Sequence, residues 1–112
     1  MTPGLFGKMA NVQWRMPKDA AEIAQQSAAR LQHGFSLLIK QQLLKQEITV
    51  REFCSAAGKS YDRMLRVLNG QMVMKLEDVG IAEVLLGEVA RMVSGEERAA
   101  VRQRLGLANW NL

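Results

Sequence analysis

Apolar residues between positions 18 and 47 recur at the spacing of one helix face. Leu31, Phe35, Leu38 and Ile39 follow the spacing i, i+4, i+7 and i+8 and form one apolar stripe. Leu37 and Leu44 widen this stripe. His33 and Gly34 interrupt this stripe, and a glycine inside a helix costs about 1 kcal/mol relative to alanine. The pattern predicts either two helices, over 19–32 and 35–46, or one helix with a weak point between them.

A capping signal marks the start of the next helix. Thr49 is a good N-cap residue, and Glu52 stands three positions later, as in a capping box. We expect a short helix over 50–57 that ends at Gly58, since glycine readily takes the left-handed conformation of a helix terminus.

Another short helix is expected after the turn Gly58-Lys59-Ser60. Ser60 is its N-cap candidate, and Asn69-Gly70 supplies a left-handed stop. Two more helical stretches follow, over 76–86 and 95–105, and no segment has the alternation or β-branched density of paired strands. The sequence therefore predicts an all-α fold, a compact bundle of about five helices.

The length of 112 residues fits one domain, and a composition of 48% hydrophobic and 23% charged residues excludes a disordered chain. We expect a single helical domain over 19–112. An N-terminal arm over 1–18 should precede it, because prolines and glycines occur there without periodicity.

Membrane, secreted and metal-binding proteins are not expected. No apolar run approaches the roughly 18 residues of a membrane span, and the first residues lack the apolar segment of a signal peptide, which favours a cytoplasmic protein. One cysteine and one histidine allow no internal disulfide and too few ligands for zinc. Cys54 is expected to be a buried spacer, and no metal or cofactor is predicted.

An enzyme is not expected either. Gly58-Lys59-Ser60 resembles the end of a phosphate-binding loop, but Phe53 stands where that motif requires a glycine, and a helix rather than a strand precedes it. The acidic residues over 77–97 form no close carboxylate pair that would support glycosidase-like chemistry.

Positive charge is concentrated in the middle of the chain. The net charge is +4, and residues 59–75 contain four basic groups against one acidic group, whereas residues 76–112 are net acidic. Clustered positive charge indicates a polyanionic partner. Four basic side chains are expected to face it: Lys59, Arg63, Arg66 and Lys75.

The helix opened by Ser60 divides into two faces at about 100° per residue. One face is apolar and should pack against the inner face of the preceding helix: Met64, Val67 and Leu68 against Phe53 and Ala57, with Cys54 as a small residue at the crossing. The opposite face presents Tyr61, Asp62, Leu65, Arg66 and Asn69. A helix with Arg, Asn and Tyr on its outer face fits the major groove of DNA, where these side chains can read base edges.

The segment from about 32 to 88 resembles a lambda-repressor-like (Cro/CI, XRE-type) helix-turn-helix domain. The matching features are Cys54 and Gly58, the Ser60 turn, the run from Met64 to Gly70, and the following MKLEDVGIAEVLL. The resemblance implies a helix-turn-helix over 49–70, in a transcriptional regulator that binds double-stranded DNA with the helix over 60–69.

The same resemblance assigns roles on that helix. Base-contacting positions fall on Tyr61, Asp62, Leu65 and Arg66, and positions near phosphates fall on Ser60, Arg63 and Asn69. The chain departs from the family at Lys59, where an aliphatic residue is usual, and at Val50, where many members place a polar side chain that touches phosphate. Thr49 or Arg51 would replace that phosphate contact.

Two further interpretations concern partners. Two short helices at this spacing also serve as a packing unit, so a protein–protein adaptor or antitoxin-like inhibitor without DNA binding is the alternative; an RNA binder would need more aromatic surface than 5% of residues supply. A homodimer is expected, because one recognition helix reads too few base pairs for specificity. Its contact would come from the apolar residues of the last helix and tail: Val101, Leu105, Leu107 and Trp110.

Overall fold

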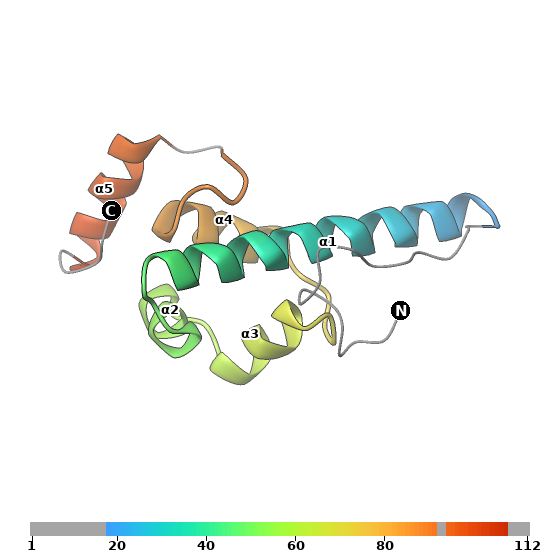
Figure 1. Ribbon diagram of the computed structural model, residues 1–112, viewed down its shortest axis with the longest axis horizontal. Coiled ribbons are helices and arrows are strands. Elements are labelled where there is room, and N and C mark those ends of the chain that lie inside the picture. The colour runs from blue at the N-terminus through green and yellow to red at the C-terminus, as the bar shows by residue number, and fades with distance from the viewer. Residues whose placement is uncertain (1–17, 92–93, 108–112) are drawn as a thin grey trace.

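The computed structural model describes residues 18–91 and 94–107, and over these ranges the chain is helical with no strand (Figure 1). Five helices follow in order: α1 (Ala20–Lys45), α2 (Val50–Ala57), α3 (Tyr61–Leu68), α4 (Leu76–Leu85) and α5 (Gly95–Arg104). The expected all-α fold is confirmed. The last four helices have the expected bounds to within a residue.

The first helix, α1, is continuous through Gly34, which settles the choice between one helix and two. It is 26 residues long and begins at Asp19, whose side chain accepts a hydrogen bond from the backbone N–H of Glu22. Helix-favouring residues on both sides of Gly34 offset the cost of the glycine. In Figure 1, α1 runs along the molecule, with α2 and α3 below it.

The buried face of α1 overlaps the predicted apolar stripe in part, since Ile39 is fully buried and Phe35 and Leu38 pack against the core. Its buried residues are His33, Ser36, Ile39 and Leu43. Leu31 is 63% exposed and Leu44 is 82% exposed, so Leu44 does not widen the packed stripe. Gln32 and Lys40, four residues before and after Ser36, hydrogen-bond to Val67, Met72 and Asn69, so the end of α3 and its connection to α4 lie against this face.

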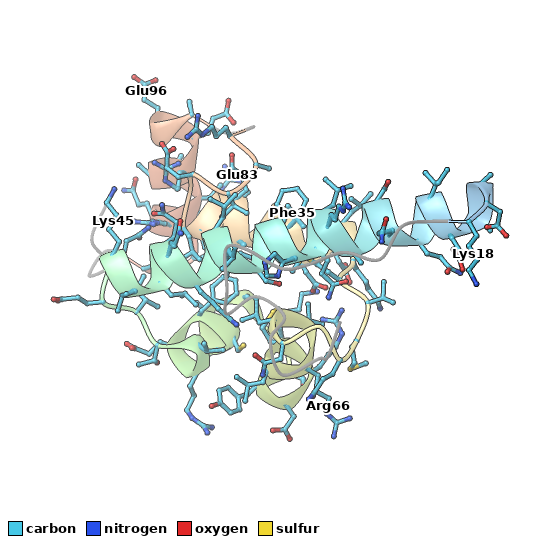
Figure 2. All side chains as sticks on the ribbon, turned by 45° about the vertical axis from the view of Figure 1, so that its right-hand side comes forward. Lys18, Phe35, Lys45, Arg66, Glu83 and Glu96 are labelled. Atoms are coloured by element: carbon cyan, nitrogen blue, oxygen red, sulfur yellow. The ribbon has the colours of Figure 1, made fainter. Side chains whose placement is uncertain are left out.

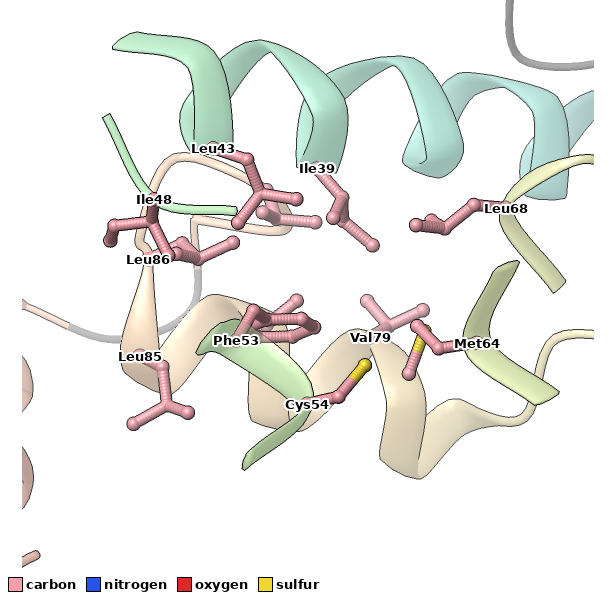
Figure 3. Packing of buried hydrophobic residues seen from close by; sticks show 12 residues of the cluster. Ile39, Leu43, Ile48, Phe53, Cys54, Met64, Leu68, Val79, Leu85 and Leu86 are labelled. Atoms are coloured by element: carbon pink, nitrogen blue, oxygen red, sulfur yellow. The ribbon is translucent and has the colours of Figure 1, made fainter. Parts of the chain in front are cut away.

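The hydrophobic core lies between α1 and the layer formed by α2, α3 and α4 (Figure 3). Ile39 from α1, Phe53 from α2 and Met64 from α3 are all fully buried. Val79 and Leu85 from α4 complete the cluster from the other side. Burial of each large apolar side chain contributes about 1.5–3 kcal/mol, so this cluster fixes how α2 and α3 are held against α1.

One amide side chain joins α1 to the connection between α3 and α4. Gln32 Nε2 donates to the carbonyl oxygens of Val67 at 3.0 Å and Met72 at 2.8 Å. Its Oε1 accepts a hydrogen bond from the backbone N–H of Met74 at 3.0 Å. Gln32 therefore ties α1 to the C-terminal end of α3 by one hydrogen bond and to the α3–α4 connection by two.

Helix α5 is held by a buried arginine. Arg102 is 2% exposed, and its Nε donates to the carbonyl oxygen of Leu85 at 2.7 Å while Nη2 donates to Gln46 Oε1 at 2.9 Å. Burial, and secondarily the charge of Arg98, lowers the pKa of Arg102. Gln46 Nε2 in turn donates to the carbonyl oxygen of Leu86 at 2.7 Å. These bonds join the end of α1, the end of α4 and α5.

Candidate nucleic-acid interface

The start of α2 is fixed by a reciprocal cap, as the sequence predicts. The backbone N–H of Glu52 donates to Thr49 Oγ1 at 3.1 Å, and the backbone N–H of Thr49 donates to Glu52 Oε1 at 3.0 Å. Hydrogen bonds to the Glu52 carboxylate from the backbone N–H and from the side chain of Thr49 lower the pKa of Glu52. At the other end, Gly58 takes the left-handed conformation with φ of 68°, which ends α2 where the sequence predicts.

The turn from α2 to α3 is short and hydrogen-bonded. The backbone N–H of Lys59 donates to the carbonyl oxygen of Cys54 at 3.0 Å, and Ser60 Oγ accepts from the backbone N–H of Arg63 at 3.3 Å. Ser60 is thus the N-cap of α3, as expected. Cap and turn together fix the direction in which α3 leaves α2.

The inner face of α3 packs against α2 and the core. Met64 and Val67 are fully buried, and Leu68 is 1% exposed. Cys54 is 2% exposed, which confirms the expected burial of this thiol, and burial raises its pKa. Because α3 is only eight residues long, these contacts determine which side chains it turns outward.

The outer face of α3 carries the residues to which the sequence assigns base contacts. Asp62 and Arg66 are exposed, while Tyr61 and Leu65 are half-buried. Figure 2 shows Arg66 projecting on the side of the molecule away from α1. The four side chains therefore lie along one helix surface with a polar, solvent-facing edge.

Arg51 of α2 joins this surface. Its guanidinium carbon lies 4.1 Å from the centroid of the Tyr61 ring, a cation–π contact between the two helices. The contact places a cation beside the N-terminal end of α3, next to Tyr61. Thr49 is exposed at the start of the same helix.

Arg63, in contrast, is occupied by an ion pair within the fold. Its Nη1 and Nη2 donate to Asp78 Oδ1 and Oδ2 at 2.9 and 2.8 Å, and the Asp78 side chain is fully buried. Burial by itself would raise the pKa of Asp78. The hydrogen bonds from Arg63 and from the backbone N–H of Lys75, with the charges of Arg63 and Lys59, outweigh it and hold the pKa below its usual value.

The other candidate phosphate contacts also have neighbours. Lys59 Nζ lies 3.4 Å from Glu77 Oε1, and Lys40 Nζ donates to Asn69 Oδ1 at 3.4 Å. Lys75 is exposed and precedes α4, where its backbone N–H donates to Asp78 Oδ2 at 2.8 Å. The Lys59 and Glu77 side chains are 26% and 62% exposed, and an ion pair near the surface contributes little in water, so Lys59 can exchange this partner for a phosphate.

The structure thus brings together residues from α1, α2, α3 and the start of α4. Sequence reasoning missed three of them: Asp78, which occupies Arg63; Glu77, which lies beside Lys59; and Lys40, which reaches Asn69 from α1. A capping pattern is readable because its partners are three residues apart, whereas Arg63 and Asp78 are separated by fifteen positions. No local spacing signals such a pair.

The described ranges hold no group of three or more side chains able to bind a metal ion. Within them, no helix has the length and apolar character needed to cross a membrane.

The expected dimer contact is only partly described. Val101 is half-buried, Leu105 is 49% exposed and Leu107 packs against the core, while Trp110 lies outside the described residues, as does the expected arm except for Lys18.

The chain matches no family model, no curated protein and no solved structure.

Proposed function

We propose that α2 and α3 form a helix-turn-helix and that the protein is a small DNA-binding regulator of the lambda-repressor-like type. The observation that carries the proposal is the outer face of α3, where Arg66 and Asp62 are exposed on a short helix that is capped at its start and packed along its other side. An exposed arginine on such a helix can donate two hydrogen bonds to guanine, and an aspartate can accept one from cytosine.

Affinity would come from basic and polar groups around α3. Arg51 beside Tyr61, Lys59 in the turn and Lys75 before α4 supply positive charge at this surface. Thr49, Ser60 and Asn69 are polar groups at helix ends that can also reach phosphates. Arg63 is left out of this set, because its guanidinium is bound by Asp78 and acts as a support for α3.

The test is selection of bound duplexes from a random pool, followed by titration of the selected duplex and of a scrambled one. Arg66→Ala should weaken binding to the selected duplex by about 1–3 kcal/mol and relax the preference at one base position. Arg104→Ala, which removes an equal charge from an exposed site on α5, is the matched control and should bind as the unmodified protein does.

Salt dependence provides a second readout. Each phosphate neutralised should contribute about −0.9 to the slope of log affinity against log salt.

Equal loss of affinity for both duplexes with Arg66→Ala would contradict base reading by this face. Absence of any enriched duplex, with no salt-sensitive binding, would contradict DNA binding and favour the adaptor or antitoxin-like alternative.

A further inference from the structure

The N-terminal half of α1 extends beyond the other helices (Figure 1). Between Ala20 and Leu31 no residue of this helix is buried. Ile23 is 52% exposed and Leu31 is 63% exposed. This half of α1 therefore has exposed apolar surface and little contact with the other described helices. Because a short helix without tertiary contacts is only marginally stable in water, it would be stabilised by burial of that surface.

Five residues of this part of α1 form a symmetric pattern, which we call the α1 stripe: Ala20, Ile23, Ser27, Leu31 and Gly34. They lie within about 80° of arc around the helix. Small and large residues alternate along the stripe, and the spacing is the same in both directions from Ser27. The stripe carries no charged side chain.

Among the residues that the structure describes, none packs into the space in front of Gly34. A Cβ atom added there would meet no atom within 4 Å. The surface in front of it is a hollow lined by Ser27, Arg30, Leu31, Gly34, Phe35 and Leu38. A neighbouring hollow shares Leu31 and Phe35 and continues to Val73, Lys75 and Leu76, of which Val73 and Leu76 are 81% and 89% exposed. The glycine therefore leaves a space that none of the described residues fills.

We propose that the α1 stripe binds the α1 stripe of a second copy of this chain, antiparallel and about a two-fold axis at Ser27. In that arrangement Ile23 packs on the partner's Leu31, and Ala20 lies opposite the partner's Gly34. An isologous interface requires one surface to be complementary to itself, which the symmetric alternation of small and large residues provides. The five residues of the stripe are uncharged and lie on α1, not on α3, so this contact is inferred without reference to the proposed function.

The exposed area is sufficient for such a dimer. Ile23, Leu31, Val73 and Leu76 together expose about 500 Å², if a fully exposed aliphatic residue presents about 180 Å². The small residues of the stripe and the half-buried Phe35 and Leu38 bring this to the roughly 600 Å² per partner of the smaller specific interfaces. Among the described residues of the C-terminal region, Leu105 is the large apolar residue with comparable exposure.

Sedimentation of the full chain over a micromolar concentration series tests the contact. The unmodified protein should be a dimer, and Leu31→Lys should be a monomer because a charge would be buried in the stripe. Leu44→Lys makes the same change at an exposed leucine on another side of α1 and should remain a dimer. Leu105→Lys should also remain a dimer.

Other results would overturn the proposal. A monomer at every concentration for the unmodified protein would mean that residues 1–17 of the same chain, or water, cover the stripe. A dimer that survives Leu31→Lys but not Leu105→Lys would place the contact at the C-terminal helix instead.

Cysteine cross-linking tests the direction of packing. An oxidised mixture of Ile23→Cys and Leu31→Cys proteins should form the mixed disulfide between the two variants. Each variant oxidised alone should form little disulfide-linked dimer. Gln25→Cys is the control on another side of the helix, and the native Cys54 is too buried to compete. Disulfides between two copies of the same variant, instead of between the two different variants, would contradict the antiparallel arrangement.

Discussion

Arg63 and Asp78 show how one residue pair decides what α3 can offer to a ligand. The bidentate pair has its carboxylate fully buried, while the arginine side chain remains 22% exposed. Removing the arginine leaves a buried carboxylate with one backbone donor, that of Lys75. Breaking one side of a buried pair is far more costly than replacing both.

Arg63→Met should therefore lower the free energy of unfolding by about 2–4 kcal/mol. Arg66→Met, three positions along the same helix and exposed, should change it by less than about 0.5 kcal/mol. Urea unfolding of both variants measures the contrast. Similar stabilities for the two would show that the buried pair does not support α3.

The same pair predicts an acid-dependent loss of stability. The pKa of Asp78 in the folded protein lies below its ordinary value of 3.8, because its partners outweigh the effect of burial. The carboxylate therefore contributes stability above its unfolded pKa, and this contribution is lost as the pH falls through the folded pKa.

Unfolding of the protein and of Asp78→Asn should be compared from about pH 7 down to about pH 3. The difference in unfolding free energy between them should be constant near neutrality and should shrink below about pH 4. A difference that stays constant to the lowest pH would contradict ionisation of Asp78 as its source.

At the scale of helices, the caps explain why the α2–α3 unit forms where it does. Thr49→Ala removes one hydrogen bond of the reciprocal cap and weakens the other, and it should destabilise the protein by about 1 kcal/mol. Ser55→Ala, an exposed change within the same helix, is the control and should have almost no effect. Urea unfolding distinguishes them, and equal effects would argue against the cap.

Caps and turns were also the part of the fold that the sequence made predictable. Thr49, Gly58 and Ser60 act on backbone groups within a few residues, so the helix ends that they form can be recognised from the sequence without the tertiary structure. The inner and outer faces of α3 followed from helix geometry alone, and the burial of Met64, Val67 and Leu68 confirms that assignment.

The buried face of α1 was not predictable in the same way. Counting apolar positions favoured Leu31 and Leu44, but the core uses the face with His33 and Ser36 because of where α3 and the α3–α4 connection approach it. Which side of a helix is covered depends on distant segments. For the same reason, no spacing in the sequence indicated that Arg63 would form an ion pair with Asp78.

For the whole molecule, Arg102 determines how firmly α5 is attached. Arg102→Leu would leave the carbonyl oxygen of Leu85 and the side chain of Gln46 without this donor. We expect amide hydrogen exchange over 95–104 to become faster while exchange in the buried parts of α1 and α4 changes little, since local opening costs less than global unfolding.

Arg104→Leu alters an exposed position on the same helix and is the control. Uniformly faster exchange throughout the chain would mean that α5 is an integral part of one cooperative unit. Unchanged exchange over 95–104 would mean that Arg102 is not what holds it.

The Gln32 side chain has a consequence for communication across the molecule. Its amide is bonded to the C-terminal end of α3, and it is the chain neighbour of Leu31 on the exposed side of α1. We expect a ligand that favours one orientation of α3 to change, through this amide, the affinity of the α1 stripe for its partner. Thermodynamic reciprocity requires the reverse effect to be equally large, so Gln32→Ala should uncouple the two binding events while leaving each of them possible.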